Sequence, residues 1–177
     1  MEFRFFRRGE NGRQLGVTAW CLGAPALMIA SAPLGGGLGL RRWVLNAEVP
    51  SSYGRLDPAV HLAELAAGLS LHGPGVGLLT AVDVGHLQRS SDGGVQVAAT
   101  VGLGHPVWAA AAPADRLAAA EPAPAGTVNI VAWVPVRLSD AALVNAVATA
   151  TEAKNQALVG ARVPRHRPTP TPVFPPR

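Results

Sequence analysis

Charged residues are scarce in this chain of 177 residues, in which Asp, Glu, Lys and Arg together make up 15% and hydrophobic residues make up 49%. This composition excludes an intrinsically disordered protein, because disordered chains are rich in charge and poor in apolar side chains. The length fits one domain of roughly 100 to 200 residues that can bury a core of its own. We therefore predict a single folded domain.

Cysteine occurs once, as Cys21, which excludes an intrachain disulfide and a cysteine-rich zinc site. Residues 15–40 contain no charge and follow an arginine-rich start, so a membrane span or a signal peptide has to be considered. Glycines and prolines divide this stretch into pieces too short for a membrane-spanning helix. Cleavage after Ala32 would cut a motif described below. We expect a cytoplasmic protein without membrane contact.

The net charge of +4 raises the question of nucleic-acid binding. The positive charge lies at the two ends of the chain, and residues 14–159 between them carry a net charge of −2. Residues 14–159 contain no basic strand with interleaved aromatic side chains that could stack on bases. Nucleic acid is therefore not an expected partner.

Short apolar runs flanked by Gly or Pro predict strands, and apolar residues at spacings of three and four predict helices. The expected strands are residues 26–32, 43–49, 76–82, 95–101 and 128–136. One helix is expected from Pro58 to Leu69, with Asp57 as its N-cap, and a second follows an N-cap at Ser139 and continues through Leu158. The fold class is therefore α/β or α+β, with a β-sheet core of about five strands and at least two covering helices. We expect residues 109–125 to form a loop region and the Arg- and Pro-rich residues 160–177 to form an extended tail.

A series of short sequence motifs, taken in their order along the chain, resembles the adenosylcobinamide amidohydrolase family. They include Ser-Ala-Pro-Leu-Gly-Gly-Gly and Asn-Ala-Glu-Val-Pro, and the whole set comprises residues 31–37, 46–50, 57–62, 75–84, 99–104, 126–130 and 138–154. Single Gly-rich turns and Ala-rich helices are common, but their order and spacing are specific. We assign residues 26–159 to this family-like domain. Residues 1–25 match no motif.

The resemblance implies hydrolysis of the amide that joins adenosylcobyric acid to aminopropanol in adenosylcobinamide, a corrinoid salvage step towards cobalamin. The corrinoid is the expected small-molecule partner, its cobalt belongs to the substrate, and no cofactor or protein-bound metal is expected. Homo-oligomerisation stays open. One rival is a homologue that binds a corrinoid without cutting it, because the tail replaces a Gly- and Thr-rich segment of the family. A nucleotide-binding loop is disfavoured because no phosphate-binding lysine follows the glycine run.

Three residues are candidates for catalysis. Asp83 follows an apolar strand and would stand at its carboxyl end, where open sheets bind ligands, although a helix N-cap is the equal alternative. His61 shares a helix face with Asp57 and Glu64, which indicates either a catalytic imidazole and carboxylate or a surface pair. Thr80 offers a hydroxyl nucleophile, although packing within a strand is the simpler reading.

Further candidates would bind the substrate. The run Gly35, Gly36 and Gly37 lets backbone N–H groups approach a ligand or forms a plain turn. Polar and aromatic side chains suit an amide-fringed macrocycle, since amides donate and accept and rings offer flat faces. Each is as readily a turn, cap or core residue. These candidates are Asn46, Tyr53, Asn129, Asn145 and Glu152.

Overall fold

The computed structural model describes residues 2–10, 12–104 and 126–162. Within these ranges the chain forms one α/β domain with seven strands in two sheets. The strands are β1 (Glu2–Glu10), β2 (Arg13–Ala30), β3 (Gly37–Glu48), β4 (Gly75–Thr80), β5 (Gln88–Asp92), β6 (Val95–Val101) and β7 (Val128–Trp133). The helices are α1 (Pro58–Gly68), α3 (Asp140–Gly160) and a single 3-10 turn, η1 (Val84–His86).

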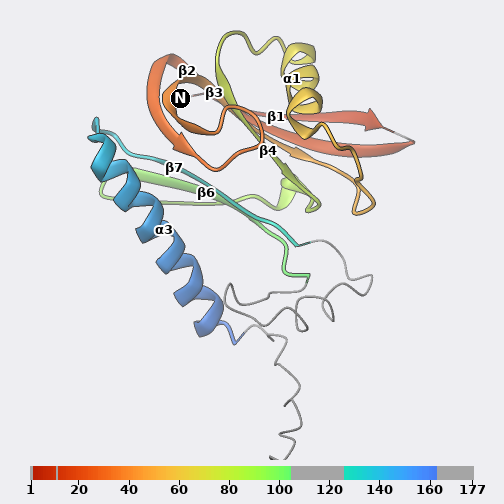
Figure 1. Ribbon diagram of the computed structural model, residues 1–177. Helices are drawn as coiled ribbons and strands as arrows, with labels where there is room; N and C mark the ends of the chain where they lie inside the picture. The colour runs from red at the N-terminus through yellow and green to blue at the C-terminus, as the bar shows by residue number, and fades with distance from the viewer. Residues whose placement is uncertain (1, 11, 105–125, 163–177) are drawn as a thin grey trace, which may run out of the picture.

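The larger sheet has the strand order β1-β2-β3-β4. β1, β2 and β3 pair antiparallel, whereas β3 and β4 pair parallel. Parallel neighbours need a crossover connection, and α1 supplies it between β3 and β4. Figure 1 shows α1 lying over this sheet. The crossover brings the carboxyl ends of β3 and β4 to the same edge of the sheet.

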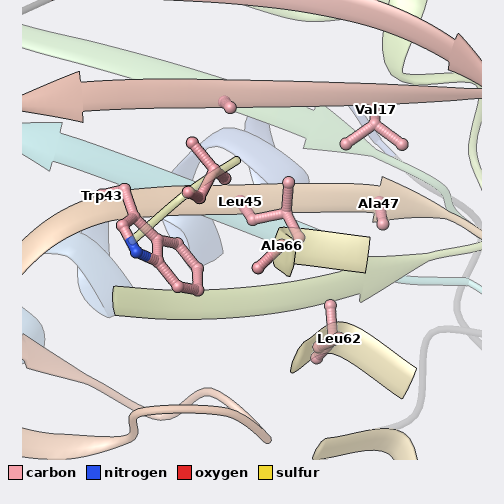
Figure 2. Close-up of a cluster of buried hydrophobic side chains, with 8 residues drawn as sticks. Val17, Trp43, Leu45, Ala47, Leu62 and Ala66 are labelled. Atoms are coloured by element: carbon pink, nitrogen blue, oxygen red, sulfur yellow. The ribbon is translucent and has the colours of Figure 1, made fainter. Parts of the chain in front are cut away.

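The helix-facing side of the larger sheet holds one half of the core. Buried side chains from β2 and β3 pack against the apolar stripe of α1, and Figure 2 shows most of them: Val17, Ala19, Trp43, Leu45, Ala47, Leu62, Ala66 and Leu71. Leu62 and Ala66 of this stripe are buried, and Leu65 and Leu69 pack at its margin, which are the spacings of three and four typical of a helix that packs on a sheet. Burial of such side chains stabilises the fold by about 1.5–3 kcal/mol each.

The opposite side of the larger sheet faces the antiparallel sheet β5-β6-β7. Trp20, Val44 and Val76 of the larger sheet pack with Ala98 of β6 and Val131 of β7. The residues of β3 therefore alternate between the two halves of the core. Figure 1 shows β6 and β7 running beneath the larger sheet, on the side away from α1.

Helix α3 begins as expected, since the Ser139 hydroxyl accepts a hydrogen bond from the N–H of Ala142 over 3.3 Å. It lies on the opposite side of the molecule from α1 and contacts β2 (Figure 1). None of its residues is fully buried. One stripe of the helix is half-buried, whereas Val147 is 46% exposed. The half-buried stripe comprises Leu143, Ala146, Ala150, Lys154 and Leu158.

Two sequence expectations need correction. Asp57 precedes α1, but its side chain makes no cap hydrogen bond, because the carboxylate pairs with Arg55. Residues 1–25 match no motif, yet β1 and most of β2 lie in this segment and form half of the larger sheet. The expected loop at 109–125 and most of the tail lie outside the described residues. None of the helices in the described ranges is both long and apolar enough to cross a membrane.

Candidate active site at the carboxyl ends of β3 and β4

A polar cavity of about 410 Å³ opens where β3 and β4 end. Glu48 of β3 pairs with Thr80 of β4, and the N–H of Val49 donates to the Thr80 carbonyl oxygen over 2.8 Å. The cavity is lined from three segments, namely the start of β2, the end of β3 and the residues after β4, and its polar walls include Arg13, Gln14, Glu48 and Ser51. Ligands commonly bind at the carboxyl ends of parallel strands. This edge is therefore the candidate active site.

The Glu48 carboxylate is held in place from β2. The N–H of Gly16 donates to its Oε2 over 2.8 Å, and the Arg8 guanidinium donates to its backbone carbonyl oxygen over 2.6 Å. A Cβ atom on Gly16 would lie 2.7 Å from a methyl group of Val84 and 3.3 Å from Oε2. Glycine is therefore needed at position 16 for this close approach.

Asp83 lies three residues beyond β4, at the same edge of the sheet. Its Oδ1 accepts a hydrogen bond from the N–H of Gly85 over 2.7 Å, so Asp83 is the N-cap of η1. The sequence predicts a helix N-cap as the alternative to a catalytic role for this residue. Val84 of η1 packs beside Gly16 near the Glu48 carboxylate. The fold thus brings Asp83 and Glu48 to one region.

Thr80 is buried, and its hydroxyl oxygen accepts a hydrogen bond from the N–H of Val82 over 3.1 Å. This local bond stabilises the turn that leaves β4 and leads towards Asp83. The geometry therefore gives Thr80 a clear packing and turn-forming role.

His61 is buried at 4% exposure on the α1 side of the same sheet edge. Its Nδ1 lies 3.0 Å from the Tyr53 hydroxyl, and the two rings stack with centroids 5.5 Å apart. Its Nε2 lies 3.8 Å from a carboxylate oxygen of Glu10. Burial, with the positive charges of Arg55 and Arg8, lowers the pKa of His61. Burial thus favours the neutral form of the imidazole. The 3.8 Å between Nε2 and the Glu10 carboxylate oxygen is too long for a hydrogen bond.

Arg8 connects the group formed by His61, Tyr53 and Glu10 to the end of β3. It pairs with Glu10 and also donates to the Glu48 carbonyl oxygen. Its Nε is buried and has no hydrogen-bond partner among the described residues. Burial lowers the pKa of Arg8 and raises the pKa of Tyr53. Ionisable groups thus flank the end of β3 on both faces of the sheet.

The expected pairing of His61 with Asp57 and Glu64 is wrong. Both carboxylates bind Arg55, at 2.8 Å for Asp57 and 3.2 Å for Glu64. Hydrogen bonds from Arg55 lower the pKa of Asp57. His61 points instead into the fold, where Tyr53 and Glu10 surround it.

Asn46 and Asn129 meet between the two sheets. The Asn129 amide donates to Oδ1 of Asn46 over 2.8 Å and to the carbonyl oxygen of Leu79 over 2.9 Å. The Asn46 amide donates to the Thr100 hydroxyl over 3.1 Å. Asn46 and Thr100 are both 1% exposed. The sequence selected both asparagines, and the structure joins them in a buried network that connects β3, β4, β6 and β7.

The glycine run lies near the amino end of β4, away from Glu48 and Asp83. Gly35 has a φ of +67°, and a Cβ there would lie 1.9 Å from the carbonyl oxygen of Gly75. Arg41 donates to the Gly35 carbonyl oxygen over 3.0 and 3.1 Å. A Cβ on Gly36 would meet the Ala32 carbonyl oxygen at 2.6 Å, whereas Gly37 has open space beside it. The run forms a tight turn packed on β4.

Asn145 and Glu152 lie on the exposed face of α3. Within the described part of the chain, neither forms a hydrogen bond or ion pair between its side chain and a residue at the β3–β4 edge. The described residues also contain no group of three or more His, Cys, Asp or Glu side chains that could hold a metal ion.

Sequence reasoning missed three members of the site, namely Glu48, Glu10 and Arg8. Glu48 belongs to the Asn-Ala-Glu-Val-Pro phrase and ends a predicted strand, which is the same signal that selected Asp83. Arg8 and Glu10 belong to a segment without motifs. Only the pairing of β1 with β2 brings these two residues to α1.

A second cavity of about 410 Å³ lies between the two sheets. Its lining includes the indole rings of Trp20 and Trp133 together with Arg89 and Gln96. The Arg89 guanidinium also lies over the ring of Phe3, 5.1 Å from its centroid. No Asp or Glu is among the described residues that line this cavity, unlike the cavity at Glu48.

Comparison with known proteins gives a consistent result. The model of the adenosylcobinamide amidohydrolase family matches residues 4–172. An adenosylcobinamide amidohydrolase of Methanosarcina mazei is 32% identical over 129 residues, which cover 73% of this chain and 58% of that protein. A protein of the same name from Halobacterium salinarum is 45% identical over 98 residues, which cover 53% of this chain and 41% of that protein.

The chain thus spans about half the length of these curated relatives. No solved structure matches it. The match of the family model includes β1 and β2 as well as the motifs from residue 31 onwards. Because this match covers nearly the whole chain, the protein belongs to the adenosylcobinamide amidohydrolase family.

Proposed function

We propose that the protein hydrolyses the amide linking adenosylcobyric acid to aminopropanol in adenosylcobinamide, as a cytoplasmic salvage step towards cobalamin. The observation that carries this proposal is the match of the family model to residues 4–172. A polar cavity at the carboxyl ends of β3 and β4 offers a place for the reaction. The cobalt is part of the substrate, and the proposed chemistry uses no cofactor bound by the protein.

Amide hydrolysis needs a base for the attacking water and a proton for the leaving amine. Asp83 is a candidate for the base because it stands at the ligand-binding edge with Oδ1 fixed by the Gly85 N–H. His61 is a candidate for proton transfer, since its neutral ring contacts the Tyr53 hydroxyl. Thr80 is the weakest of these candidates, because its hydroxyl is buried and hydrogen-bonded.

The proposed substrate contacts also differ in their support. Tyr53 lies at the same sheet edge as the cavity, since its N–H donates to the carbonyl oxygen of Pro50, which lines that cavity. Asn46 and Asn129 contribute by fixing the two sheets relative to each other. The remaining residues proposed to bind the substrate lie away from this cavity, on the glycine turn and on α3. They are Gly35, Gly36, Gly37, Asn145 and Glu152.

The test is incubation of the purified 177-residue chain with adenosylcobinamide. The expected result is equal amounts of aminopropanol and adenosylcobyric acid, separated by chromatography and identified by mass. Tight binding with no product would contradict the proposal and would identify a corrinoid carrier. The same incubation with chelator present checks that no metal other than the cobalt of the substrate is required.

A further inference from the structure

Glu48 ends β3 and is one of the residues that line the polar cavity. Its position depends on two contacts that differ in kind. The Gly16 N–H fixes Oε2 at 2.8 Å, and the hydrogen bond from Arg8 to the Glu48 carbonyl oxygen fixes the backbone at 2.6 Å. One carboxylate oxygen is thus oriented by the Gly16 N–H, and this contact does not occupy the other oxygen, Oε1.

The surroundings of Glu48 suit an attack by water on an amide. Arg13 and Ser51 line the same cavity, and their side chains are of the kind that donates hydrogen bonds to a carbonyl oxygen as negative charge develops on it. Hydrogen-bond donors and a carboxylate acceptor therefore share one polar space at the end of parallel strands.

A purely structural role explains less of this arrangement. If the role of Glu48 were structural alone, its carboxylate would serve only to accept from the N–H of Gly16. For that one hydrogen bond the fold would keep a glutamate at the cavity and exclude any side chain from position 16. Two exposed carboxylates among the described residues instead pair with arginines, Glu2 with Arg4 and Asp57 with Arg55.

We propose that the cavity at the end of β3 is the hydrolytic site and that Glu48, which lines it, is its general base in place of Asp83, an inference that rests on the proposed function. Glu48 takes a proton from water as the water oxygen bonds to the amide carbon, which gives a tetrahedral intermediate. The carboxyl group then returns that proton to the amide nitrogen. The carbon–nitrogen bond breaks, and a carboxylic acid and a free amine leave.

The test compares Glu48→Gln with the wild-type chain and with Glu2→Gln, which neutralises an exposed carboxylate on β1. Glutamine keeps an oxygen to accept from the Gly16 N–H but cannot act as a base. General-base catalysis contributes about 10²- to 10⁴-fold, so kcat should fall by at least about 100-fold. KM and the melting temperature should stay near the wild-type values, and Glu2→Gln should leave all three unchanged.

Two results would refute the role of Glu48 without affecting the proposed function. In the first, the kcat of Glu48→Gln lies within about threefold of the wild-type value. In the second, the kcat falls only as much as the fraction of folded protein falls. If that variant melts early, Glu48→Ala with added formate gives a second test, because a small carboxylate in the vacated space should restore turnover. A folded Glu48→Ala protein that formate does not rescue would refute the base. An inactive wild-type chain would refute the proposed function itself, and the base with it.

Discussion

The buried asparagine network between the sheets gives the sharpest stability prediction. Asn46 is 1% exposed and takes part in two hydrogen bonds, donating to the Thr100 hydroxyl at 3.1 Å and accepting from the Asn129 amide at 2.8 Å. Asn46→Ala removes both bonds and leaves a small cavity between β3 and the sheet formed by β5, β6 and β7. The Thr100 hydroxyl stays buried without this donor.

The expected cost follows from these contacts. Each intramolecular hydrogen bond contributes about 0.5–1.5 kcal/mol net, and a buried polar group left without its partner adds about 1–3 kcal/mol. With two hydrogen bonds lost and the Thr100 hydroxyl left without its partner, Asn46→Ala should therefore lower the free energy of unfolding by about 2–6 kcal/mol. Asn129→Ala should cost about 1–3 kcal/mol, because that half-buried amide donates to Asn46 and to Leu79. The double variant should cost about 1 kcal/mol less than the sum, since both single variants remove the same Asn46–Asn129 bond.

Urea unfolding of the four proteins, followed by tryptophan fluorescence, measures these differences. Asn145→Ala is the matched control, because this asparagine lies on the exposed face of α3 and should change stability by less than about 0.5 kcal/mol. The network would be refuted if Asn46→Ala also changed the free energy of unfolding by less than about 0.5 kcal/mol. It would also be refuted if the cost of the double variant equalled the sum of the costs of the two single variants.

Three further predictions concern ionisation and backbone geometry. Burial lowers the pKa of folded His61 below its usual value near 6.5, so the unfolded chain binds this proton more readily. The free energy of unfolding should therefore fall as pH drops from about 6.5 through the folded pKa, and His61→Gln should flatten this dependence in urea titrations. Gly35→Ala should cost at least about 3 kcal/mol, because it combines a φ of +67° with a backbone clash, whereas Gly37→Ala, with open space, should cost about 1–2 kcal/mol. Urea unfolding of both variants checks this difference, and equal costs would contradict the turn geometry. Arg55→Ala should raise the pKa of Asp57 towards its ordinary value in an NMR titration, and an unchanged pKa would refute their pairing.

Much of the fold could be predicted from local patterns. β6 matches its predicted bounds, and α1 begins at Pro58 as expected, because the apolar spacing and the helix-start signals agree there. The missed strands lack such signals. β5 is polar and exposed along its whole length, so no hydrophobic alternation marks it. β1 acquires its place only by pairing with β2, which no local pattern encodes.

The candidate site was harder to predict, because its contacts join distant segments. Helical spacing favoured Asp57 and Glu64 as partners of His61, but both turn to Arg55. The carboxylate that does approach His61 is Glu10, which lies at the end of β1 and 51 residues earlier in the chain. Such a contact depends on strand register and on how α1 packs, which a single sequence does not specify.

The most direct test of amide hydrolysis by this chain is turnover of adenosylcobinamide in water enriched in ¹⁸O. Hydrolysis adds one solvent oxygen to the new carboxyl group, so mass spectrometry should find adenosylcobyric acid heavier by one ¹⁸O atom and unlabelled aminopropanol in equal amount. Unchanged adenosylcobinamide after prolonged incubation with folded protein, or adenosylcobyric acid formed without the label, would contradict hydrolysis.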